Sequence, residues 1–152
     1  MADDGREYYA INYDCNWSKA DQWVKDNVIA QLPDPPLPQM YSSAKQYQKT
    51  EAYKQGWRNK ITIASEVKQF VLNSNEKPEF WADYASYDWV VFCQLFGTMM
   101  DLPKGFPMYC NDLQQTLKDL GSPELPKQKE GQHNALADAR HCKVLLEFLE
   151  QQ

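Results

Sequence analysis

The sequence predicts a single α/β domain, and three observations lead to this prediction. Segments whose apolar residues alternate, as in strands, precede segments whose apolar residues recur at helical spacing, and this order repeats along the chain. Hydrophobic residues make up 43% of the 152 residues, which is enough for a folded core. No apolar run has the length of a membrane span, so we expect no membrane partner.

The N-terminal part of the chain predicts a strand followed by a helix. Tyr9, Ile11 and Tyr13 alternate with smaller or polar residues, as in a strand. Ser18 with Asp21 three residues later resembles a capping box, so a helix should begin there. The side chains expected to face the core from this helix are Trp23, Val24, Val28 and Leu32.

Residues 33–60 combine a proline-rich link with a basic and aromatic insertion. Four prolines within residues 33–38 end the preceding helix and favour an extended link. Residues 41–60 contain five cations and one anion, a net charge of +4, so the remainder of the chain carries −9. Four aromatic residues are interleaved with these cations, namely Tyr41, Tyr47, Tyr53 and Trp57.

The rest of the chain repeats the alternation of helices and strands. A second amphipathic helix should end near residues 73–75, with an apolar face made of Ile63, Val67, Phe70 and Val71. The segment EFWADYA, residues 79–85, predicts a strand that leads into a helix beginning near Asp88. A short helix near 111–120 and a C-terminal helix within 133–149 follow.

Two of these helices carry a carboxylate on their apolar face. Asp138 shares a face with Ala135, Ala139, Cys142, Leu145, Leu146 and Leu149. Asp88 shares a face with Val91, Phe92, Leu95 and Met99. An ionised carboxylate taken out of water is costly unless a cation or hydrogen bonds compensate it. A helix N-terminus could stabilise Asp88, and an arginine or a cap could pair with Asp138, but the two together favour a shared divalent cation such as Mg²⁺.

His133 adds a group that exchanges protons near neutral pH. It stands at the junction of the loop and the C-terminal helix, five positions before Asp138, so both side chains could reach one pocket. The alternative is a solvated loop histidine. The four cysteines are scattered without a C-x-x-C pair, so reduced thiols in a cytoplasmic protein are expected rather than zinc or disulfides.

These residues belong to motifs that resemble a known family. HNALADA at 133–139 resembles the third motif of the DEDDh 3′–5′ exonucleases, in which a histidine precedes an aspartate by five positions. YASYDW at 84–89 resembles their second motif. Together with DGREYYA near the start, the longer text around both motifs is similar to one branch, the polyadenylate-specific RNase AS group. That branch is RNase T-like and belongs to the ribonuclease H-like superfamily.

The resemblance implies a fold, a reaction and roles for three residues. It implies a ribonuclease H-like exonuclease fold, with a mixed central sheet flanked by helices and here lacking its first strands. It implies hydrolysis of adenine-rich RNA 3′ ends with two Mg²⁺ ions, or Mn²⁺, held by four carboxylates. Asp88 matches the second-motif ligand, Asp138 the third-motif ligand, and His133 the general base. Single-stranded RNA and a second copy of the chain, as a homodimer, are the implied partners.

The sequence departs from the family at the first motif. That motif is an Asp-x-Glu on the central strand, and no such tripeptide occurs in the 152 residues. Asp3 and Asp4 lie in a polar turn and do not replace it. With two of four ligands missing, hydrolysis by this chain should be weak or absent. Our preferred interpretation is a late start at Met1, and the alternative is a short protein that has lost catalysis or borrows strands from a partner.

Two other functions remain open on sequence grounds. A non-catalytic RNA-binding or interaction module on the same fold would explain the missing motif. Cations among aromatics suit phosphate contacts and base stacking, which makes Lys49 and Arg58 candidate substrate-binding residues. A solvated helix or loop with buried tyrosines is slightly favoured for that segment. A DNA-trimming exonuclease is the third possibility, because the chemistry does not itself select ribose.

Overall fold

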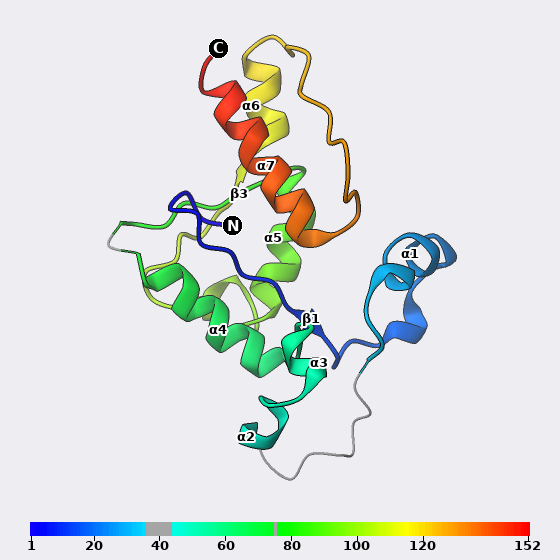
Figure 1. Ribbon diagram of the computed structural model, residues 1–152. Helices are drawn as coiled ribbons and strands as arrows, with labels where there is room; N and C mark the ends of the chain where they lie inside the picture. Colours follow the sequence, from blue (N-terminus) through cyan, green and yellow to red (C-terminus); the bar gives the residue numbers. More distant parts are fainter. Residues whose placement is uncertain (36–43, 75) are drawn as a thin grey trace. The chain divides into compact units, whose positions relative to one another are not determined.

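The computed structural model describes residues 1–35, 44–74 and 76–152 (Figure 1). Pro36, Leu37, Pro38 and Tyr41, which belong to the expected proline-rich link and aromatic segment, lie outside the described residues. The chain forms two compact units, one of residues 9–65 and one of residues 1–8 with 66–152. One domain over residues 1–152 stays a prediction.

The unit of residues 9–65 is built around one short parallel strand pair. Its elements are β1 (Ile11–Asn12), η1 (Trp17–Lys19), α1 (Gln22–Asn27), η2 (Ile29–Gln31), α2 (Ala44–Tyr47), α3 (Glu51–Lys54) and β2 (Trp57–Arg58). Ile11 pairs with Trp57 in the register of β1 and β2. Their side chains are 5% and 2% exposed, so this pair forms the centre of the unit.

Helix α1 differs from its prediction in both its start and its buried face. Asp21 is the N-cap, since its carboxylate accepts from the backbone amide of Val24 at 2.8 Å, whereas Ser18 lies in the preceding 3-10 turn. Trp23 is 52% exposed, and no residue of α1 is buried. A helix of six residues presents less than two turns to a core, so its apolar side chains remain largely in solvent.

The second unit contains another parallel strand pair and the longest helices. Helix α4 (Lys60–Leu72) enters it from the first unit. The other elements are β3 (Trp81–Ala82), α5 (Ala85–Gln94), η3 (Met99–Asp101), β4 (Asn111–Asp112), α6 (Leu113–Asp119) and α7 (Ala135–Leu149). Strand β3 pairs with β4 in parallel; α6 follows β4 at once, and α5 follows β3 after two residues.

This arrangement confirms the mixed α/β class and shows much shorter strands than the sequence pattern predicts. In the described residues the strands form two separate two-stranded pairs, not one mixed sheet. The central sheet of a ribonuclease H-like fold therefore stays a prediction. None of the helices in the described ranges has the length and apolar character needed to cross a bilayer.

Helix α5 exposes part of the face that the sequence assigns to the core. Ala85 and Cys93 are its buried residues, whereas Val91 is 64% exposed. Phe92 packs as expected, with its ring 4.9 Å from that of Phe80. Met99 lies beyond the helix, in η3, and is 43% exposed. The apolar face of α5 is therefore only partly covered by the described residues.

The main core of this unit lies between α6 and α7. Leu113, Leu145 and Leu149 are at most 5% exposed and form one cluster, against which Trp81 and Leu117 pack. Ile63 and Val67 of α4 are also buried, at 7% and 9%. The helical periodicity thus identifies Ile63, Val67, Leu145 and Leu149 correctly as buried positions. Ala135, also expected on the apolar face, is exposed because it begins α7 at the junction with the loop.

We expect Leu113→Ala to destabilise the protein by about 2–5 kcal/mol, since it removes three carbons from a side chain that is 2% exposed and leaves a cavity. Leu120→Ala is the matched control, because Leu120 ends the same segment but is 43% exposed. Chemical denaturation followed by circular dichroism measures both. An equal loss in the two variants would contradict the core described here.

Candidate active site

The candidate site is built where the parallel strands β3 and β4 end. Asp112 ends β4, caps α6 by accepting from Gln114 N at 2.9 Å, and accepts from Ala85 N at the start of α5 at 3.1 Å. One carboxylate therefore ties the starts of both helices together. Between β3 and α5 the chain turns through Tyr84, whose φ of 55° is left-handed. Carboxyl ends of parallel strands share one edge, where α/β proteins place ligands.

Asp83 follows β3 directly and lies half-buried in this edge. Its Oδ1 accepts from the side-chain amide of Gln114 at 2.7 Å. Asp88 stands one turn further on, in the first turn of α5, and its side chain is exposed. Partial desolvation and the nearby Asp83 carboxylate raise the pKa of Asp88 above its usual range. The site is therefore unfavourable for the negative charge on Asp88 in the absence of a cation.

Asp138 is half-buried in the first turn of α7. Asn134 caps this helix and accepts from the amides of Leu136 and Ala137 at 3.2 and 3.1 Å. The Asp138 Oδ1 accepts from Gln128 Nε2 at 2.9 Å, so its partner in the structure is a neutral amide of the preceding loop and not an arginine. The hydrogen bond fixes one carboxylate oxygen.

The two predicted carboxylates, Asp88 and Asp138, both influence the pKa of the Cys142 thiol. Burial raises the pKa of Cys142, a hydrogen bond with the Asp83 backbone lowers it, and the charges of Asp83, Asp88 and Asp138 raise it. Cys110 has a pKa raised to about 11 by burial and by Asp88, Asp112 and Cys142. Asp83, Asp88 and Asp138 therefore each act on the Cys142 thiol, whereas the charge that raises the pKa of Asp88 is that of Asp83.

His133 lies five positions before Asp138 in the chain. It occupies an exposed turn with a φ of 68°, a left-handed conformation that is uncommon outside glycine. The turn is held on its other side by Gly131, where an added Cβ would lie 2.7 Å from the Ala137 Cβ. The backbone therefore positions His133 through a constrained turn.

The donors at this site have the right chemistry for a hard divalent cation, but they are incomplete. Carboxylate oxygens are the ligands that Mg²⁺ prefers, and such an ion would relieve the repulsion that raises the pKa of Asp88. In the part of the chain that the structure describes, however, no group of three or more His, Cys, Asp or Glu side chains could hold a metal. This agrees with the lack of an Asp-x-Glu motif in the sequence.

Sequence reasoning missed three polar residues of the site. Asp83 directly follows β3 and Asp112 ends β4, so a position at the end of a strand was the available signal. No sequence pattern marks Gln128 as a site residue, because it lies in an irregular loop. Its hydrogen-bond partner, Asp138, is ten residues away in the sequence. Its role depends on how that loop folds against α7.

The two candidate RNA-binding residues of the basic segment differ in their surroundings. The Arg58 guanidinium lies 3.2 Å from the centre of the Tyr53 ring and donates to the carbonyls of Tyr53 and Trp57 at 2.6 and 2.9 Å. Tyr47 packs edge-on against Tyr53 and donates to the Trp57 carbonyl at 2.8 Å. These contacts support the interpretation of packed tyrosines, while Lys49 remains exposed.

We expect Asp88→Asn to raise the free energy of unfolding at pH 7 without metal. The pKa of Asp88 is raised in the folded protein, so ionisation destabilises the fold as pH rises through the unfolded and then the folded pKa. The gain should vanish near pH 3, where the carboxyl is protonated in both states. Denaturation at several pH values in EDTA measures this.

Asp101→Asn is the control of opposite sign. Hydrogen bonds from Thr98 lower the pKa of Asp101, so its charge stabilises the fold at pH 7 and that stabilisation is lost as pH falls. A loss of stability in both variants at pH 7 would contradict the interpretation that the negative charge on Asp88 destabilises the fold.

Comparisons with known proteins identify the family of this chain. Residues 42–149 match a family described as the 3′-5′ exoribonuclease Rv2179c-like domain. Two relatives from Mycobacterium tuberculosis, 3′-5′ exoribonuclease Rv2179c of strain H37Rv and 3′-5′ exoribonuclease MT2234.1 of strain CDC 1551, are each 33% identical over 141 residues. The alignments cover 92% of this chain and 74% of each relative. The chain therefore belongs to the Rv2179c-like 3′-5′ exoribonuclease family.

Proposed function

We propose that this protein is a divalent-metal-dependent 3′–5′ exoribonuclease of the RNase AS type that shortens adenine-rich RNA. The observation that carries the proposal is the family match over residues 42–149, which includes Asp88, His133 and Asp138. The charges of Asp88 and Asp138, which both raise the pKa of the half-buried Cys142 thiol, give it physical support.

The proposed chemistry assigns a role to each residue. Asp88 and Asp138 would hold Mg²⁺, or Mn²⁺, which supplies charge stabilisation for the phosphoryl displacement. His133 would accept a proton from the water whose oxygen attacks the terminal phosphorus. The bond between that phosphorus and the preceding 3′ oxygen then breaks. The products are a nucleoside 5′-monophosphate and an RNA one nucleotide shorter with a free 3′ hydroxyl.

A second function is favoured by one specific observation. The described residues lack a group of three or more ligand-type side chains, and the sequence lacks Asp-x-Glu. A module that binds RNA without hydrolysing it would need neither. Binding and turnover therefore have to be measured separately.

The test uses 5′-labelled oligoadenylate, oligocytidylate and oligodeoxyadenylate of equal length with the chain as given. We expect slow single-nucleotide shortening of oligoadenylate, because two of the four metal ligands are missing, and this shortening should require Mg²⁺ or Mn²⁺ and stop in EDTA. Binding without shortening at any metal concentration would favour the non-catalytic module. Faster shortening of the deoxy substrate would replace RNA by DNA as the substrate.

A further inference from the structure

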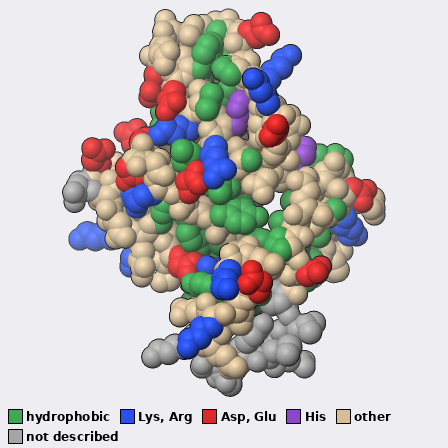
Figure 2. All heavy atoms as spheres, in the orientation of Figure 1, with side chains coloured by type: hydrophobic (Ala, Val, Ile, Leu, Met, Phe, Trp, Pro, Cys, Tyr) green, Lys and Arg blue, Asp and Glu red, His purple; other side chains and the backbone are tan. Residues whose placement is uncertain are grey.

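A shallow groove lies between the loop that precedes α7 and the first turns of that helix, and it is lined by Gln128, which donates a hydrogen bond to Asp138. It has a volume of about 560 Å³. One wall is formed by residues 126–131 and the other by Ala137, Arg140, His141 and Val144. Both walls belong to the unit of residues 66–152. On the face of the molecule drawn in Figure 2, histidine, basic and acidic side chains lie interspersed.

The groove is positively charged in a chain that is acidic as a whole. Lys127, Lys129 and Arg140 line it against the single acid Glu130, while the chain carries a net charge of −5. Both lysines are exposed, so their ammonium groups are available to a ligand. Arg140 is instead held by a two-point ion pair with Glu7 at 2.6 and 2.7 Å. The lysines are therefore the charges that a bound anion would meet.

The loop wall is held in place by several polar and steric contacts. Besides its bond to Asp138, Gln128 Nε2 donates to the Glu130 carbonyl at 3.2 Å. Gln132 Nε2 donates back to the Gln128 carbonyl at 3.4 Å. Gly131 approaches Ala137 so closely that an added Cβ would meet the Ala137 Cβ at 2.7 Å. A wall fixed in this way costs little entropy to order when a ligand binds.

Gln128 belongs to the groove and to the candidate active site at once. Its side chain turns inward to Asp138, whereas its neighbours Lys127 and Lys129 are exposed on either side. A strand lying in the groove would therefore pass beside Gln128, the hydrogen-bond partner of Asp138. In the wall formed by α7, Ala137 and Val144 add apolar surface and His141 offers an aromatic ring.

We propose that this groove binds the single-stranded RNA on the 5′ side of the nucleotide being removed. Lys127 and Lys129 contact its phosphates, and a base stacks on His141. The inference rests on the proposed function, because that function places the RNA 3′ end at Asp138. Cations combined with an aromatic ring and apolar floor favour RNA over an acidic peptide, which would need no stacking surface.

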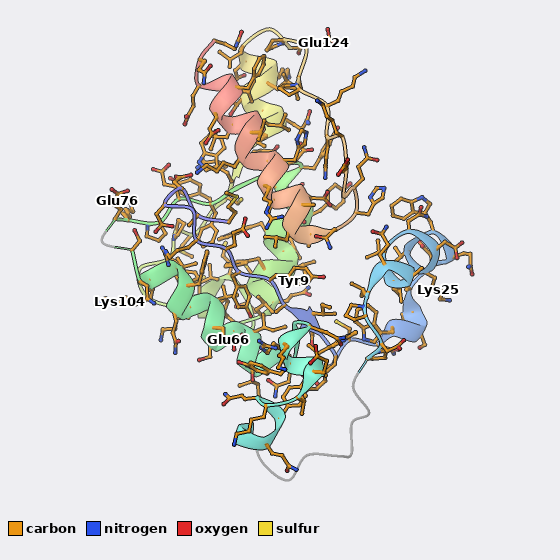
Figure 3. All side chains as sticks on the ribbon, viewed as in Figure 1. Tyr9, Lys25, Glu66, Glu76, Lys104 and Glu124 are labelled. Atoms are coloured by element: carbon orange, nitrogen blue, oxygen red, sulfur yellow. The ribbon has the colours of Figure 1, made fainter. Side chains whose placement is uncertain are left out.

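The test compares Lys127→Gln/Lys129→Gln with Lys104→Gln/Lys118→Gln, which removes two exposed lysines of the same unit outside the groove. In Figure 3, Lys104 lies well away from α7. Binding of labelled 12-mer and 3-mer oligoadenylate is measured in EDTA by fluorescence anisotropy. We expect the groove variant to bind the 12-mer at least about tenfold more weakly and the 3-mer nearly unchanged. Its salt slope should fall by about 1.4, from 0.7 for each lost phosphate contact.

His141 provides a second, independent variant. His141→Ala should weaken 12-mer binding, and His141→Phe should restore it, because an aromatic ring supports stacking without charge. Equal 12-mer affinity in the two lysine double variants would overturn the groove. The proposal would also be overturned if poly-glutamate displaced the labelled 12-mer as effectively as unlabelled oligoadenylate of equal charge does.

The same variants separate this inference from the proposed function. Unchanged 12-mer affinity together with hydrolysis that depends on Asp138 would reject the groove alone. Loss of 12-mer binding in the lysine variant of a chain that never hydrolyses RNA would reject the exonuclease and retain the binding groove.

Discussion

Asp138→Asn should lower the rate of oligoadenylate shortening by about 10²–10³-fold at saturating Mg²⁺, the range seen when one group that stabilises transition-state charge is removed. Asparagine has nearly the same shape and keeps an oxygen that can accept from Gln128, so the loop that borders α7 should remain in place. The variant removes the negative charge and little else. Any loss of activity therefore reports on the charge.

A metal-binding measurement makes this prediction independent of a weak activity. Mn²⁺ binding followed by electron paramagnetic resonance should weaken in Asp138→Asn, because an amide oxygen is a poorer ligand for a hard cation than a carboxylate. Asp119→Asn is the matched control, since Asp119 also accepts from a glutamine amide, that of Gln115 at 2.8 Å, but lies in the last turn of α6. Equal Mn²⁺ affinity in both variants would exclude Asp138 as a ligand.

The helices show what the sequence can predict about this fold. In α4 and α7 the apolar residues recur over thirteen and fifteen residues, and such a long pattern identifies one inward face. Ile63, Val67, Leu145 and Leu149 are buried as that pattern requires. In α1, six residues give too few repeats to fix a face, and Trp23 is exposed.

The strands were harder to predict, because their extent depends on pairing with distant residues. The alternation of Tyr9, Ile11 and Tyr13 predicts a longer strand than the two residues that pair with β2. The segment EFWADYA likewise contains only Trp81 and Ala82 as paired residues. The alternation of residues in the sequence indicates that a segment can be extended. Hydrogen-bonded pairing of two strands also needs a partner segment of matching length.

Part of the candidate site can be predicted from the sequence, and part cannot. An acid on an apolar helix face is visible in the sequence, and the charges of Asp88 and Asp138 each raise the pKa of the Cys142 thiol. The argument that both carboxylates are removed from water on buried helix faces is only partly right, since Asp88 is exposed and the face around Val91 is not buried. The Gln128 contact depends on a loop without periodicity, so no sequence pattern could predict it.

His133→Gly should separate the chemistry of the side chain from the demands of its backbone. The φ of 68° costs a side-chain-bearing residue about 1–2 kcal/mol, and glycine adopts it freely. Glycine also increases the entropy of the unfolded chain, which offsets about 0.4–1 kcal/mol of that gain. The free energy of unfolding should therefore stay constant or rise slightly.

Activity should change far more than stability in this variant. If the imidazole accepts the proton of the attacking water, its removal should lower kcat by about 10²–10⁴-fold. Rate measurements with 5′-labelled oligoadenylate and chemical denaturation give the two quantities on the same preparation. Loss of rate in a protein of undiminished stability cannot result from unfolding.

Ser122→Gly is the matched backbone control. Ser122 has a φ of 59° in an exposed turn after α6, so glycine should relieve the same kind of strain there without changing the rate. A His133→Gly protein as active as Ser122→Gly would show that His133 is a solvated loop residue. Strained positions persist when the surrounding structure or the function requires them. A left-handed histidine that can be replaced by glycine with a gain in stability but a large loss in rate is retained for its imidazole.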